Sequence, residues 1–172
     1  MNSIALRETL KIITGDKIPH YVVAADSAIK EIDVRKTPFL AIQNCSKEDS
    51  PGSHWICWYA LTSSTVEYLD SYGKPVSKYP DVEFPIENIV RESCLQLQDD
   101  QSNLCGLYCL AFAHYRLLGF SYDYFLSLFG EETLQNDLII CRWAQKYLPT
   151  FHVNKINNTK IQNSVKKCHV IC

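Results

Sequence analysis

The sequence lacks any apolar run close to the roughly 18 consecutive residues that a membrane-spanning helix needs. It also lacks an excess of one charge, because 17 basic and 19 acidic side chains leave a net charge of -2. The opening residues have neither the basic head nor the cleavage site of a signal peptide. We therefore expect no membrane partner, no overall positive field to hold nucleic acid, and a place in the cytosol or nucleus rather than outside the cell.

Internal repeats and low-complexity tracts are likewise absent, and 172 residues at 47% hydrophobic composition suffice to bury a core. We expect one domain over residues 1–151, a polar C-terminal tail over residues 152–172, and a monomer. The eight cysteines have no evident secretory route to a disulfide framework, so reduced thiols are expected.

The spacing of four cysteines is compatible with a zinc site. Cys105 and Cys109 form one pair, and Cys168 and Cys172 form another, each within the looser range of zinc-ligand spacing. The first pair lies in a strongly apolar helical stretch and the second in a polar tail. The sequence therefore predicts no metal.

Helical and strand-like patterns follow one another in an order typical of an α+β domain. Ile4, Leu10 and Ile13 lie at helical spacing after Ser3, which could cap a helix over residues 3–13. Short apolar segments between turn residues predict strands at residues 39–43, 54–61, 66–70 and 95–98. Further helices are predicted at residues 86–92, 105–118, 122–129 and 131–147. The expected fold is α+β, a central mixed sheet flanked by helices, with Cys105 at the N-terminal end of a buried helix.

Cys105 stands where a catalytic thiol could be activated. A thiol reacts as the thiolate, which the unpaired amides and dipole of a helix N-terminus stabilise. Gly106 follows it and leaves the backbone free to approach a substrate carbonyl. Cys109 lies one turn deeper among apolar neighbours and is expected in the core. Taken alone, Cys105 could also be a buried cysteine at a helix start.

A nucleophilic thiol needs a general base, and the chain has five histidines. They are His20, His54, His114, His152 and His169. His114 is excluded, because nine steps of about 100° along the helix put it on the face opposite Cys105. His54 begins the aromatic strand HWICWYAL after the turn-forming SPGS, so a rigid strand could hold its ring at a sheet edge. It could also be an ordinary histidine at a strand end.

Asp70 and Gln98 are candidate partners for this pair. If the two strands before Asp70 form a hairpin, the carboxylate lies beside His54 and could orient the imidazole. Otherwise Asp70 only caps the turn that follows it. Gln98 could donate an amide N–H to an oxyanion together with the Cys105 backbone, or it could be a surface glutamine.

The residues around these positions form three motifs, GSHW at residues 52–55, YLDSYG at 68–73 and QDDQSNLCGLYC at 98–109. These motifs are similar to those of the adenain family, the maturation cysteine proteases of adenoviruses, and less closely to those of the SUMO-specific cysteine proteases. The order His, acid, Gln, Cys is the order of these families. Upstream, LKIITGD, IPHYVVAAD and PFLAIQN resemble adenain segments in order and spacing, so the resemblance covers roughly residues 9–120.

The resemblance implies an adenain-like or SUMO-protease-like fold and a role for each motif residue. Cys105 is the nucleophile, His54 its base, Asp70 the group that orients the imidazole, and Gln98 an oxyanion donor. Trp55 lines the catalytic floor beside His54. Adenain carries a glutamate at the place of Asp70, whereas the SUMO-type relatives carry an aspartate.

The first function implied is a viral cysteine endopeptidase that cleaves capsid and core precursor proteins during virion maturation, in the host nucleus and the virion. A second is a deconjugating protease for SUMO or another ubiquitin-like modifier, and a third is a non-catalytic binding module on the same fold. The short chain, with little beyond the core fold, favours the viral enzyme.

No cofactor is expected for the chemistry itself. Adenain uses DNA and a short viral peptide as activators, and the near-neutral charge of this chain argues against DNA. The adenain peptide joins a cysteine between the acid and the oxyanion glutamine, a place taken here by Cys94, which could instead be a buried structural cysteine. The tail sequence VKKCHVIC at residues 165–172 is similar in character to such a peptide and could supply it in cis.

Overall fold

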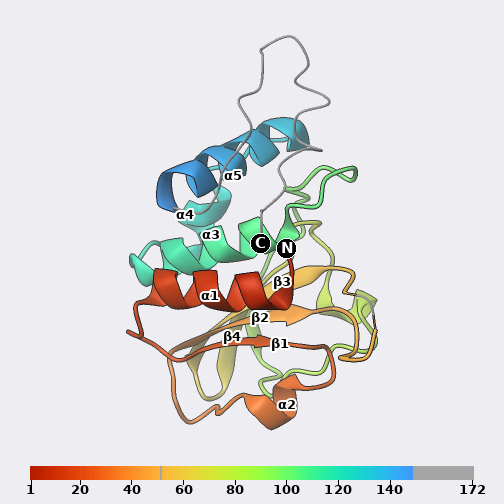
Figure 1. Ribbon diagram of the computed structural model, residues 1–172, viewed down its shortest axis with the longest axis vertical. Helices are drawn as coiled ribbons and strands as arrows, with labels where there is room; N and C mark the ends of the chain where they lie inside the picture. The colour runs from red at the N-terminus through yellow and green to blue at the C-terminus, as the bar shows by residue number, and fades with distance from the viewer. Residues whose placement is uncertain (51, 149–172) are drawn as a thin grey trace.

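The computed structural model describes residues 1–50 and 52–148, which form an α+β fold with a five-stranded mixed sheet packed against helices (Figure 1). The predicted tail at residues 152–172, with its VKKCHVIC sequence, lies outside the described residues. No helix in the described part of the chain is long and apolar enough to cross a membrane.

The sheet has the strand order β1-β2-β3-β4-β5, so neighbours in the chain are neighbours in the sheet. The three central strands form an antiparallel meander, whereas β1 runs parallel to β2 and β5 parallel to β4. The bounds are β1 His20–Val23, β2 Phe39–Asn44, β3 Trp55–Thr62, β4 Thr65–Leu69 and β5 Ile89–Glu92. The three central strands were predicted from their apolar runs, and the structure confirms them.

Most helices gather on one face of the sheet, where α1 packs beside α3 and α3 beside α5 (Figure 1). The bounds are α1 Ser3–Thr14, α2 Ala28–Glu31, α3 Cys105–Leu117, α4 Tyr122–Leu126 and α5 Thr133–Tyr147, with a 3-10 turn η1 at Val76–Lys78. The helices predicted at the N-terminus, after Cys105 and near residues 122–147 are confirmed. Asn2 rather than Ser3 caps α1, since its Oδ1 accepts the Ala5 N–H at 2.8 Å.

The helix α3 forms the centre of the larger core because almost every face of it is apolar. Its residues are buried from Gly106 to Ala113. The opposite face of the sheet is covered by α2 and the chain around η1, where the Trp58 and Phe84 rings stack with centroids 4.2 Å apart. Apolar burial on both faces therefore holds the sheet and the start of α3 in a fixed relation.

Two predictions between β4 and α3 are wrong. Residues 86–92 do not form a helix, because Ile89–Glu92, which begins with two β-branched residues, pairs with β4 as strand β5. Residues 95–98 do not form a strand, because the Leu97 and Gln98 amides both donate to the single Ser71 carbonyl, at 2.8 and 2.9 Å, instead of to a ladder. This clamp brings Gln98 next to the turn after β4.

Candidate active site

His54 and Asp70 meet because β3 and β4 are antiparallel and joined by a tight turn. Cys57 pairs with Leu69 across the two strands, so the residue before β3 lies beside the residue after β4. The His54 Nε2 and Asp70 Oδ1 atoms are 2.7 Å apart, and both side chains are buried. The hairpin expected from the sequence thus brings the two side chains into contact.

Asp70 is saturated with hydrogen-bond donors. Besides His54 Nε2, its Oδ1 accepts the Tyr72 N–H at 2.8 Å, and its Oδ2 accepts the Tyr79 hydroxyl at 2.6 Å and the Lys74 N–H at 3.3 Å. Burial alone would raise the Asp70 pKa, but the hydrogen bonds and the charge of His54 lower it overall. The carboxylate therefore caps the turn after β4 and binds the imidazole at the same time.

His54 lies against two aromatic rings, with the Tyr72 and Tyr79 centroids 4.8 and 5.8 Å from the imidazole centroid. Burial would lower the His54 pKa, but its interactions with Asp70 and Cys105 outweigh burial and raise the pKa to about 9. Nδ1 has no hydrogen bond of ordinary length among the described residues. Since Nε2 is bound to Asp70, Nδ1 is the nitrogen left to interact with the thiol.

Cys105 begins α3 and is half-buried. Leu104 before it makes no side-chain cap, and its carbonyl accepts the Leu107 N–H at 2.8 Å, so the Cys105 and Gly106 amides are the ones left at the helix start to donate. Burial raises the Cys105 pKa, but the interaction with the positively charged His54 imidazole and with the Trp55 backbone lowers it below its usual value. A thiolate beside an imidazolium is the state that a nucleophilic cysteine needs.

Gln98 is fully buried, so the alternative of a surface glutamine is wrong. Its Oε1 accepts the Ser71 hydroxyl at 2.7 Å, which fixes the orientation of the amide. Its Nε2 donates to the Ser102 carbonyl at 3.0 Å and to the Tyr72 hydroxyl at 3.2 Å. Both amide hydrogens are engaged inside the protein, so donation to a substrate requires one of these bonds to be exchanged.

Gly73 explains how the turn after β4 can lie against the segment that carries Gln98. Its φ is +65°, and a Cβ at this position would come within 2.6 Å of the Leu95 carbonyl carbon. Only glycine allows both this conformation and this approach. The YLDSYG motif therefore positions Asp70 and Gln98 together.

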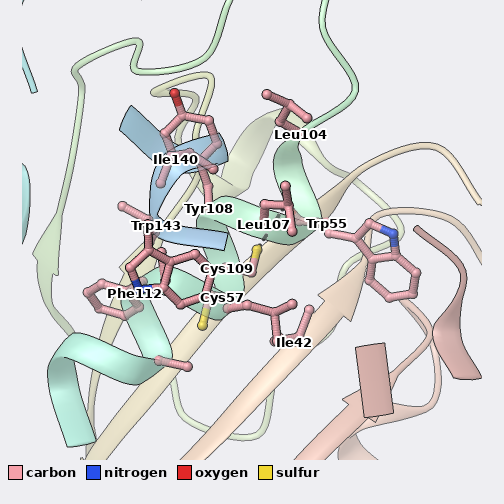
Figure 2. Close-up of a cluster of buried hydrophobic side chains, with 14 of the residues drawn as sticks. Ile42, Trp55, Cys57, Leu104, Leu107, Tyr108, Cys109, Phe112, Ile140 and Trp143 are labelled. Atoms are coloured by element: carbon pink, nitrogen blue, oxygen red, sulfur yellow. Dashed lines mark hydrogen bonds between the residues drawn. The ribbon is translucent and has the colours of Figure 1, made fainter. Parts of the chain in front are cut away.

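Trp55 lines a cleft of about 470 Å³, and neither His54 nor Cys105 is among the residues that line it. Its indole Nε1 donates to the Met1 carbonyl at 3.1 Å, and in Figure 2 its ring points away from the neighbouring buried side chains. The cleft runs past the start of α1 and the ends of β1 and β2, and its lining includes Arg7, Asn44, Lys47 and Gly52. Trp55 therefore links this cleft to the strand end that carries His54.

Gly106 lies against α1 and not in this cleft. A Cβ at Gly106 would be 3.4 Å from Leu6 Cδ2 and 3.4 Å from Met1 Cβ. Its side-chain position therefore serves the packing of α1 against α3, and only its backbone N–H could contact a substrate.

The other cysteines of the described region divide into core and surface. Cys109 lies in the core as expected, near Cys57 (Figure 2), and its Sγ donates to the Trp55 carbonyl at 3.4 Å. Cys94 is exposed, so the alternative of a buried structural cysteine is wrong there. The reason is that the segment after β5 leaves the sheet instead of forming the predicted strand.

Neither His114 nor a zinc site forms part of this group of residues. The His114 Nδ1 accepts the Trp143 Nε1–H at 3.2 Å, on the side of α3 that faces α5. Within residues 1–50 and 52–148, no three His, Cys, Asp or Glu side chains gather as metal ligands. Cys168 and Cys172 lie outside these residues.

Sequence reasoning missed three side chains that hold the site together. Ser71 and Tyr72 bind the Gln98 amide, and Tyr79 binds the Asp70 carboxylate. The first two belong to the YLDSYG motif, which was a signal that could have been used. Tyr79 carries no such signal, since its place depends on the course of the chain through η1.

Comparison with protein-family models and with curated proteins finds no match for this chain.

Proposed function

We propose that this chain is a cysteine endopeptidase of the adenain type that cleaves capsid and core precursor proteins during virion maturation. One observation carries the chemical part of the proposal. The His54 imidazole is hydrogen-bonded to the Asp70 carboxylate at 2.7 Å and interacts with the Cys105 thiol, and the pKa shifts of His54 and Cys105 favour an imidazolium and a thiolate. The viral substrate class rests on the sequence resemblance.

The reaction follows from these surroundings. Asp70 keeps the proton on His54 Nε2, which leaves Nδ1 for the thiol. The Cys105 thiolate attacks the carbonyl carbon of the scissile peptide, and the carbonyl oxygen becomes an oxyanion. His54 gives its Nδ1 proton to the amine as the C–N bond breaks, and a thioester remains. His54 then takes a proton from water as the water oxygen attacks the thioester, which releases the acid product and the thiolate.

The oxyanion needs donors that are in place before charge develops. The backbone amides at the uncapped start of α3 and the Gln98 amide are the candidates. Gln98 can give up its bond to the Tyr72 hydroxyl, the longer of its two at 3.2 Å, and keep its bond to Ser102. The chemistry then needs no metal or organic cofactor.

Substrate recognition has a natural place beside Trp55, where the cleft begins. The resemblance to adenain suggests substrates with glycines near the cut, after an aliphatic residue. If a peptide activator is used, Cys94 is the position at which it would attach, because the side chain is exposed. DNA activation forms no part of the proposal, given the net charge of -2.

The test is to incubate the purified protein with candidate precursor proteins and to sequence the new termini. We expect cleavage at glycine-containing sites with wild type and none with Cys105→Ala. Cleavage of SUMO or ubiquitin fusions but not of glycine-containing precursor peptides would instead indicate a deconjugating protease. An active-site thiol probe that fails to label Cys105 in the folded protein would point to a binding module.

A further inference from the structure

A second polar cluster lies behind the segment that carries Gln98, at the N-terminal end of α5. Asp137 is fully buried there. Its Oδ1 lies 2.9 Å from the Tyr108 hydroxyl, which is also 3.1 Å from the Leu97 carbonyl. Asn136 Nδ2 donates to the same carbonyl at 3.1 Å. The residue next to Gln98 is therefore fastened to α3 and α5 together.

The same end of α5 holds the next residue of the loop. The Thr133 hydroxyl donates to Asp99 Oδ2 at 3.2 Å. The Asp99 carbonyl accepts the Ser102 N–H at 3.0 Å, and the Ser102 carbonyl accepts the Gln98 amide. The position of the Gln98 amide thus depends on how α5 holds the loop from Leu97 to Ser102.

Two buried polar atoms in this cluster have no hydrogen bond of ordinary length within the described residues. They are Asp137 Oδ2 and Ser102 Oγ. One is a carboxylate acceptor and the other a hydroxyl donor, so each is the partner that the other needs. Ser102 is among the groups whose hydrogen bonding favours the ionised Asp137, and the carbonyl of the same residue accepts the Gln98 side-chain amide.

The charge on Asp137 should change with pH near pH 6. Burial raises the Asp137 pKa to about 6, although Tyr108, Ser102 and the Asp99 backbone act in the opposite direction. The titratable groups that face the cluster are Tyr108 on α3, Asp99 on the loop, Tyr72 beyond Gln98 and Cys141 on α5. None of these four is a cation, so none offsets the cost of burying the carboxylate.

We propose that Asp137 is a positioning residue for the oxyanion side of the candidate active site, which is the loop that carries Gln98; this inference rests on the proposed function. It acts through Ser102 and Tyr108 to set the place of the Gln98 amide, and it does not touch the substrate. Ionised Asp137 accepts hydrogen bonds from the loop, and the protonated form loses part of that capacity.

The first variant is Asp137→Asn, which keeps the shape and removes the charge. At about pH 8 we expect kcat for a glycine-containing peptide to fall about tenfold with little change in KM, because an oxyanion donor acts in the transition state. At about pH 5 wild-type Asp137 is itself protonated, so the kcat ratio of wild type to variant should approach one. Alkylation of Cys105 by iodoacetamide uses no oxyanion donor, and its rate should not change.

The second variant is Ser102→Ala, which removes the hydroxyl that faces Asp137. It should lower kcat by a similar factor, and the double variant should be no slower than the slower single variant, because both act through one contact. Glu67→Gln is the matched control. Glu67, on β4, is another buried carboxylate, and its Oε2 accepts a hydrogen bond from Arg116 Nε at 2.7 Å. Its loss should lower the melting temperature and leave kcat unchanged.

The outcomes separate this inference from the proposed function. A wild-type protein without Cys105-dependent turnover contradicts the proposed function, and this inference falls with it. If wild type is active and Asp137→Asn has the same kcat at both pH values, the role of Asp137 alone is overturned. The same follows if alkylation slows together with kcat, or if the two substitutions have additive effects. Should Asp137→Asn fail to fold, an unchanged kcat in Ser102→Ala overturns the role.

Discussion

The two sides of the candidate active site are built differently. The base side stands on the β3–β4 hairpin, and its Asp70 carboxylate receives four donors. The oxyanion side rests on the loop before α3, where both side-chain amide hydrogens of Gln98 are already donated within the protein. Ser102 Oγ in the same loop has no hydrogen bond of ordinary length to the described residues. Under the proposed function, the base side is therefore preorganised, whereas the oxyanion side would have to exchange a hydrogen bond on binding substrate.

The largest effect should come from breaking the nucleophile and base. Cys105→Ala and His54→Ala should each lower peptide cleavage by about a thousandfold or more, and the double variant should be little worse, because the two act as one unit. Steady-state cleavage of a glycine-containing peptide measures this. Cys109→Ala removes a buried thiol from the same helix and should mainly lower the melting temperature. A folded Cys109→Ala protein without turnover, beside an active Cys105→Ala protein, would reverse the assignment.

The next largest effect should come from the oxyanion side. Gln98→Ala should lower kcat about a hundredfold with little change in KM, since the amide is needed only in the transition state. The rate of Cys105 alkylation should stay near that of wild type, which separates this side from the base side. If kcat does not change, Gln98 is a structural residue that holds Ser71 and Ser102.

Stability should depend on pH through the base side. The folded-state His54 pKa of about 9 lies above its ordinary value of 6.5. The stabilisation that His54 gains from its raised pKa is therefore fully present below about pH 6.5 and is lost as pH rises through about 9. Urea unfolding of wild type should show a free energy of unfolding that falls over this window. His54→Ala should show a smaller fall, and equal slopes in the two proteins would mean that His54 gains no proton affinity on folding.

Much of the base side could be predicted from the sequence, because it depends on local pattern. The apolar runs after SPGS and before DSYG indicate two strands, a short hairpin forces their outer ends together, and His54 and Asp70 stand at those ends. The start of α3 could be predicted for the same reason, because an unbroken apolar helix follows Cys105.

The oxyanion side could not be predicted in this way. The alternating Leu95 and Leu97 have the period of a strand. The backbone amides of Leu97 and Gln98 donate to the Ser71 carbonyl, however, and not to a neighbouring strand. The contacts of Asp137 join a loop to a helix far along the chain, and no short-range pattern reports such a contact. Tyr79 reaches Asp70 only because of the path through η1.

The smallest predicted effect tests whether the base side is as redundant as its contacts indicate. Tyr79→Phe removes the 2.6 Å hydroxyl bond to Asp70 Oδ2 and leaves the His54 bond on Oδ1 intact. Losing one buried hydrogen bond to a charged group should lower the free energy of unfolding by about 1.5–3 kcal/mol, and kcat should fall only about threefold, because the remaining donors still hold the carboxylate. Tyr122→Phe is the matched control, since its hydroxyl donates to the Tyr68 carbonyl at 2.7 Å outside the site. It should cost about 1 kcal/mol of stability and leave kcat unchanged. A hundredfold loss of kcat in Tyr79→Phe would show that the base side depends on this single donor, and the contrast with the oxyanion side would then fail.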